Sequence, residues 1–90
     1  MTDSWSWIKI GQWYKEKRYN EWFYLVRRYG NNRIDYVVIR DSRVEFWIDA
    51  PVSWLFDEDS YVEINSPAEG LLKIRPHEVI MALFNPQNGR

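Results

Sequence analysis

The sequence predicts a mainly β protein, built as a small antiparallel barrel or a strongly bent sheet of five to seven strands. Short runs of β-branched and aromatic residues alternate with breaks rich in Gly, Asn, Asp and Ser, the residues that tolerate turn conformations. Trp, Tyr and Phe make up 18% of the 90 residues. Such rings suit both a pleated core and a contact surface, so the composition favours a β domain that binds something.

The centre of the chain predicts a three-stranded meander over residues 21–29, 33–40 and 43–49. The breaks at 31–32 and 41–42 consist of Asn-Asn and Asp-Ser, and both predict two-residue hairpin turns. The meander is therefore the most strongly specified part of the fold.

The flanks of the meander predict shorter elements. Residues 5–10 predict a strand, and 11–14 predict a strand end that leads into an exposed charged loop reaching residue 20. Downstream, 53–60 predicts an irregular acidic loop with a short helical turn around Trp54, Leu55 and Phe56, and 61–64 predicts a return to strand.

The C-terminal third carries conflicting signals. A turn at 67–70 leads into an expected strand over 71–75. In 76–84, Pro76 and Glu78 favour the start of a helix, whereas the short, continuously apolar run 79–84 favours a buried strand. A final strand is the preferred interpretation, and a short C-terminal helix is the alternative.

Length and composition predict one domain over residues 1–90, with 86–90 as a flexible tail. The absence of Cys excludes a disulfide framework and thiol chemistry, and it agrees with a reducing compartment. The sequence contains no apolar run long enough to span a bilayer and no signal-peptide pattern at residues 1–4. We therefore expect a cytoplasmic protein without membrane association.

Register counting divides the meander into two faces. It pairs Arg28 with Asp35 and Tyr36 with Trp47. The face expected to form the core collects mostly aliphatic side chains: Trp22, Tyr24, Val26, Val37, Ile39, Val44, Phe46 and Ile48. The opposite face mixes rings with charged groups: Phe23, Leu25, Arg27, Tyr29, Ile34, Tyr36, Val38, Arg40, Glu45 and Trp47.

The mixed face is the predicted binding site, because guanidinium groups bind carboxylates or phosphates and stack on rings, while Tyr and Trp supply rigid contact area. An alternative is that the N-terminal strand or the C-terminal segment covers these rings. The predicted binding residues are Arg27, Tyr29, Tyr36, Arg40, Arg43 and Trp47.

Catalytic and metal-binding patterns are absent from the sequence. His77 is the only histidine, and no nucleophile or orienting carboxylate is spaced around it. The acidic run 57–59 lacks the remaining positions of a calcium loop, and the four glycines stand alone rather than in a phosphate-binding loop. We expect a protein that is not an enzyme and that uses no cofactor or metal.

The predicted partner is another protein, so the sequence predicts an interaction module such as a small regulator, inhibitor or assembly factor. Self-association is a further expectation, because sheet edges and exposed rings favour dimers. The alternative function is nucleic-acid binding, since residues 1–45 carry nine Lys and Arg against six Asp and Glu. The pI of about 5.8 argues against that alternative, because phosphate contacts favour basic domains.

The number of short strands, together with a long early loop between Tyr14 and Glu21, resembles the architecture of Src-homology-type small barrels. The resemblance implies a small bent-sheet or barrel fold. The acidic-loop and proline-binding signatures of that family are not matched, so the resemblance implies no particular ligand.

Overall fold

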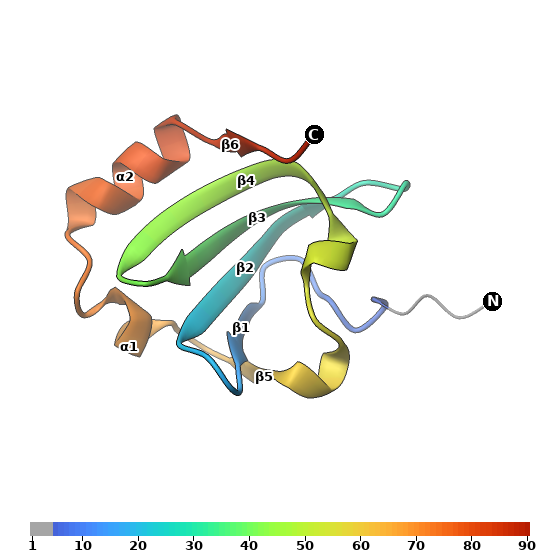
Figure 1. Ribbon diagram of the computed structural model, residues 1–90, viewed down its shortest axis with the longest axis horizontal. Coiled ribbons are helices and arrows are strands. Elements are labelled where there is room, and N and C mark those ends of the chain that lie inside the picture. Colours follow the sequence, from blue (N-terminus) through green and yellow to red (C-terminus); the bar gives the residue numbers. More distant parts are fainter. Residues whose placement is uncertain (1–4) are drawn as a thin grey trace.

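The computed structural model describes residues 5–90, so the N-terminal residues in which the sequence predicts no signal peptide lie outside the described part. The fold is mainly β, with one six-stranded mixed sheet in the order β5-β1-β2-β3-β4-β6 (Figure 1). The strands are β1 (Trp13–Glu16), β2 (Glu21–Arg28), β3 (Arg33–Arg40), β4 (Arg43–Pro51), β5 (Tyr61–Ile64) and β6 (Gln87–Asn88). All neighbours are antiparallel except β4 and β6. The strand order is linear, so among the described residues the sheet is open, and the predicted barrel is not confirmed.

The predicted meander is confirmed as β2, β3 and β4. Asp41 and Ser42 form a two-residue turn with positive φ at both positions, as expected from their sequence. The first turn instead contains three residues, 30–32, of which Asn32 has a φ of 60°. The pairing of Tyr36 with Trp47 is confirmed.

The longer first turn changes the pairing next to it. Arg28 lies opposite Ile34 rather than Asp35, so the predicted register was wrong by one residue at this end. A bulge between Leu25 and Arg27 then shifts the register by one residue more. The two shifts add to two residues, and a shift of two residues leaves every side chain on the same face of the sheet. The prediction that Leu25 and Tyr36 share a face is therefore correct.

Three predicted flanking strands are absent from the described residues. Residues 5–10 form turns rather than a strand. Over 71–75 the chain contains the last residue of α1 (Ala68–Leu71) followed by turns rather than a strand, and instead of the preferred strand over 76–84 it forms α2 (Pro76–Phe84). In α2 the helix-start signals prevail over the short apolar run, since Pro76 occupies the first turn and the Glu78 carboxylate accepts a hydrogen bond from the Arg75 N–H at 3.2 Å.

Two turns of 3-10 helix lie between β4 and β5: η1 (Val52–Trp54), which begins earlier than the turn predicted around Trp54, Leu55 and Phe56, and η2 (Glu58–Ser60). Strand β5 then begins as predicted. The C-terminal residues expected to form a tail instead include β6, which runs parallel to β4 at Trp47 and Ile48. Gly89 is buried next to this pairing.

Segments outside the sheet pack on both of its faces, and the larger core lies on the face that the sequence assigned to binding. We call this face the Leu25 face: it presents Phe23, Leu25, Tyr36 and Val38, all at most 5% exposed. Three residues cover it: Ile8 from the N-terminal turns, and Val52 and Leu55 from the η1 segment, by which we mean η1 with the residues that follow it to Phe56. The predicted choice of core face was therefore wrong, because alternation along a strand does not show which face later segments will cover.

The opposite face, which we call the Ile39 face, holds a smaller cluster of Trp22, Ile39 and Ile74, against which Val44 and Val79 pack. Figure 1 shows α1 and α2 on this side of the sheet and the η1 and η2 turns on the other. Val26, expected in the core, is 39% exposed. The Ile39 face is thus only partly covered.

Candidate functional site

The structure separates the six predicted binding residues into groups. Tyr36, Arg40 and Trp47 lie together on the Leu25 face. Arg27 and Tyr29 lie near the first turn, with the Arg27 guanidinium 4.8 Å from the centroid of the Tyr29 ring.

Tyr29 makes a contact within the fold, since its hydroxyl donates a hydrogen bond to the buried carboxylate of Asp35 at 2.8 Å. That hydrogen bond raises the pKa of Tyr29, with burial contributing less. Arg43 is exposed at the β3–β4 turn, where it borders a shallow hollow beside His77 and Glu78 of α2. The predicted site is therefore not one continuous surface.

A pocket of about 120 Å³ opens where the Leu25 face meets the η1 segment. We call it the aromatic pocket. Strands β2, β3 and β5, the last residue of η1 and the two residues after it supply the lining: Glu21, Trp22, Phe23, Tyr36, Val38, Arg40, Trp54, Leu55, Phe56 and Tyr61. Two of the predicted binding residues, Tyr36 and Arg40, are among them.

The sequence around η1 explains how the rim of this pocket forms. Val52 and Leu55 are buried at 2% and 8% exposure and anchor the segment to the core. Trp54 and Phe56, on either side of Leu55, are then directed outward and are 48% and 41% exposed. The Phe56 N–H donates to the Tyr61 hydroxyl at 3.1 Å, which fixes the segment against β5.

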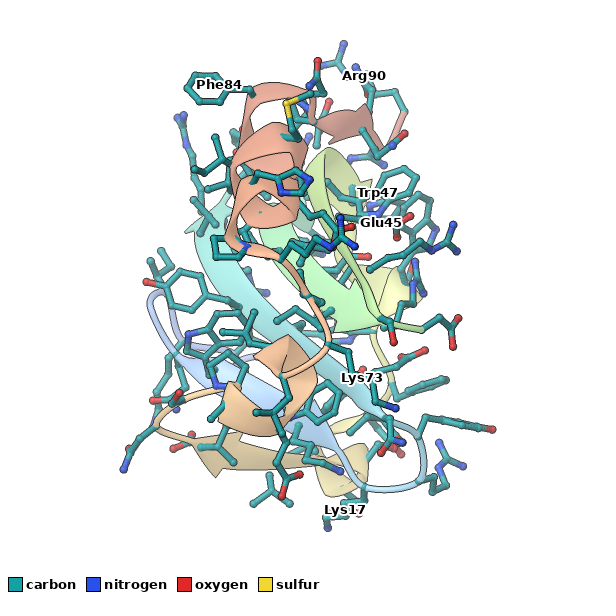
Figure 2. The ribbon with its side chains drawn as sticks, turned by 90° about the vertical axis from the view of Figure 1, so that its left-hand side faces the viewer. Lys17, Glu45, Trp47, Lys73, Phe84 and Arg90 are labelled. Carbon is teal, nitrogen blue, oxygen red and sulfur yellow. The ribbon has the colours of Figure 1, made fainter. Side chains whose placement is uncertain are left out.

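Ring contacts join this rim to the sheet. Trp54 meets Trp47 edge to face, with ring centroids 5.4 Å apart, and Phe56 stacks near Tyr61 at 6.3 Å. The Trp47 indole N–H donates weakly to the Glu45 carboxylate at 3.4 Å, and Figure 2 shows these two side chains side by side on β4. The predicted residue Trp47 therefore supports the rim from outside the pocket.

Tyr36 is only 5% exposed, and within residues 5–90 its hydroxyl has no hydrogen-bond partner. Burial raises the pKa of Tyr36 to about 12, and burial likewise raises the pKa of Tyr61 to about 12. Both phenols therefore stay neutral at physiological pH. A neutral hydroxyl without a partner at a pocket wall can donate to or accept from a ligand.

The arginines near the pocket already have internal partners. Arg40 donates to the Glu45 carboxylate at 3.2 Å. Arg18, in the β1–β2 loop, donates to Glu16 at 3.1 Å, and its guanidinium lies 5.2 Å from the centroid of Phe56. By contrast, the Glu21 carboxylate has no ion pair or hydrogen bond within the described part of the chain.

Glu16 organises the loop that carries Arg18. Its carboxylate is fully buried and accepts hydrogen bonds from the backbone N–H groups of Arg18 and Tyr19, at 2.5 and 2.6 Å. Burial alone would raise the pKa of Glu16, but these hydrogen bonds and the Arg18 guanidinium outweigh it and hold the pKa below its usual range. Tyr19 is thereby held 6.4 Å from the ring of Phe56, and it is 55% exposed.

Sequence reasoning missed the residues that form the rim and the polar lining, namely Trp54, Phe56, Tyr61 and Glu21. One signal was available, because rings at 54 and 56 flank an aliphatic residue inside an otherwise acidic loop. Such alternation predicts one inward anchor between two outward side chains.

The rest of residues 5–90 offers little other chemistry. These residues contain no cluster of three or more His, Asp and Glu side chains suited to a metal ion, and His77 is exposed on α2. None of the helices in this part of the chain has the length and apolar character needed to cross a membrane. Comparison of the chain with protein-family models, curated proteins and solved structures found no match.

Proposed function

We propose that this protein is a non-enzymatic interaction module that accepts one side chain of a partner protein in the aromatic pocket. The observation that supports this proposal best is the exposure of Trp54 and Phe56 directly above a formed pocket. Rings held outward by a buried anchor lose little further conformational entropy on binding.

The size of the pocket favours a side chain over a metabolite. Drug-sized ligands occupy roughly 300–1,000 Å³, whereas this pocket holds about 120 Å³. A pocket of this volume has room for one side-chain head group, with the surrounding rings covering its stem. A partner protein would supply the remaining contact area outside the pocket.

The charge pattern does not favour the nucleic-acid alternative. Arg18, Arg33 and Arg40 each have a carboxylate partner within the chain, which reduces their capacity to bind phosphates. The exposed acidic residues 57–59 also follow Phe56 directly. We therefore retain a protein as the proposed partner.

A random displayed peptide library selected on the folded protein tests the proposal. We expect the selected peptides to bind the wild-type chain and to lose roughly 30-fold in affinity on Trp54→Ala, the effect of one hot-spot ring contributing about 2 kcal/mol. Phe84→Ala is the matched control, because Phe84 is 79% exposed and projects outward from the end of α2 (Figure 2).

Both variants remove an exposed ring, so circular dichroism and thermal unfolding should show a retained fold in each. Equal binding by Trp54→Ala and the wild type would contradict the proposal. So would a library that yields no binding peptide. Loss of binding on Phe84→Ala alone would place the contact on α2 instead.

A further inference from the structure

We infer that the side chain accepted by the aromatic pocket is a cation, the ammonium group of a lysine or the guanidinium group of an arginine. This inference rests on the proposed function and adds the chemistry of the partner. It depends on two features of the pocket, the unpaired carboxylate of Glu21 and the aromatic rings that line the pocket with it.

The balance of charge at the pocket is negative. Arg40 lies opposite Glu21 in the β2–β3 register, but its guanidinium donates to Glu45, so two carboxylates share one cation. Arg18, which lies 5.2 Å from the Phe56 centroid but does not line the pocket, is neutralised by the buried Glu16. Glu21 thus remains the charged group available to a ligand.

The rings that line the pocket are suited to the same ligand as Glu21. Phe23, Tyr36, Trp54, Phe56 and Tyr61 all line the pocket, and the electron-rich face of a ring attracts a cation within about 6 Å. The chain uses this contact elsewhere, since the Arg27 guanidinium lies 4.8 Å from the centroid of the Tyr29 ring. A carboxylate beside several rings strengthens that attraction, because ring and carboxylate favour the same charge.

Other side chains satisfy the pocket less well. An acidic side chain would place its charge beside Glu21, while the nearby Arg40 is already paired with Glu45. An aliphatic side chain would remove Glu21 and the Tyr36 hydroxyl from water without giving either a hydrogen bond, which is unfavourable. An ammonium or guanidinium group gives both groups a donor, and its apolar stem can lie along the rings of the rim.

The test uses four acetylated and amidated pentapeptides, Gly-Ser-X-Ser-Gly, in which X is lysine, arginine, norleucine or glutamate. Each is titrated to millimolar concentration into the isotopically labelled protein while the indole N–H signal of Trp54 is followed by NMR. That signal is assigned among the six tryptophans by its loss in Trp54→Ala. We expect the lysine and arginine peptides to shift the Trp54 signal at concentrations at least tenfold lower than the norleucine and glutamate peptides do. The tighter binder of the lysine and arginine peptides shows which cation is preferred.

Glu21→Gln should weaken the binding of the lysine and arginine peptides about tenfold and leave the binding of the norleucine peptide unchanged. Glu69→Gln is the matched control, since Glu69 is an exposed carboxylate on α1 and its substitution removes the same formal charge outside the pocket. Equal or stronger binding of the norleucine or glutamate peptide would overturn the inference and leave the proposed function standing. Failure of every peptide to move the Trp54 signal would count against both.

Discussion

The C-terminal residues should contribute measurably to stability, and Gly89→Ala tests this. A Cβ atom at Gly89 would lie 2.8 Å from the Cβ and 2.9 Å from the backbone nitrogen of Ala50. Ala50 is fully buried and paired with Ile34, so its backbone cannot move aside. The strain is relieved only if the C-terminal residues detach from β4.

Detachment sets the size of the effect. It breaks the hydrogen bond from the Gly89 N–H to the Ile48 carbonyl at 2.8 Å and the one from Arg33 to the Gly89 carbonyl at 3.3 Å. Two such bonds contribute about 1 kcal/mol each, so the free energy of unfolding should fall by about 2 kcal/mol. For a domain of this size the Tm should fall by roughly 8 to 16 °C.

The assay is urea and thermal unfolding of Gly89→Ala beside the control Gly30→Ala. A Cβ atom added at Gly30 would meet no other atom within 4 Å, and Gly30 has no left-handed φ, so its substitution should change stability by less than about 0.5 kcal/mol. Both variants lose the same backbone freedom in the unfolded state, which cancels in the comparison. Equal Tm values for the two variants would refute the docking of the C-terminal residues.

Three further predictions concern the two faces and the buried polar groups. Leu25→Ala should lower the free energy of unfolding by about 2 to 5 kcal/mol because Leu25 is fully buried, whereas Val26→Ala should lower it by less than about 1 kcal/mol. The reverse order in urea unfolding would show that the main core lies on the Ile39 face. Glu16→Gln should lower stability by about 2 kcal/mol at pH 7. The folded pKa of Glu16 lies below its ordinary value of 4.5, so the carboxylate stabilises the fold above that pH and loses this contribution as the pH falls through the folded pKa. The difference in the free energy of unfolding between variant and wild type should therefore disappear in acid, and a difference independent of pH would contradict this. Tyr36→Phe should leave stability within about 0.5 kcal/mol of the wild type and reduce the phenolate absorbance that develops near pH 12, and an undiminished absorbance would contradict the burial of this hydroxyl.

Local sequence signals predicted the meander well. Asp41-Ser42 specified its turn, and counting from that turn paired Tyr36 with Trp47 correctly. Counting from the first turn failed, because nothing in the sequence distinguishes a two-residue turn at 31–32 from the observed three-residue turn at 30–32, or marks the bulge after Leu25. The two errors happened to preserve the side of the sheet on which each central residue lies.

The choice of core face depended on information outside the meander. Both faces of β2 carry apolar side chains, so alternation alone cannot rank Leu25 against Val26. Which face forms the main core depends on Ile8, Val52 and Leu55, and these residues lie in segments without regular periodicity. The same segments decide where the candidate site lies, since Trp54 and Phe56 form its rim.

Tyr36 and Arg40 were predicted as binding residues and do line the aromatic pocket. Their expected chemistry differs from what the structure favours. The sequence interpretation treated Arg40 as free to bind an acidic group, whereas its pairing with Glu45 leaves Glu21 as the available charge. Pairing between side chains on neighbouring strands follows from exact rotamers and register, which the sequence pattern does not specify.

The most direct test of the central claim is an NMR map of the labelled protein with a library-selected peptide bound. We predict the largest chemical-shift changes at the Trp54 indole N–H and at the backbone amides of Phe56 and Tyr61, with smaller changes at Arg40. Changes confined to the exposed residues of α2, with the Trp54 and Phe56 signals unmoved, would contradict the assignment of function to the aromatic pocket.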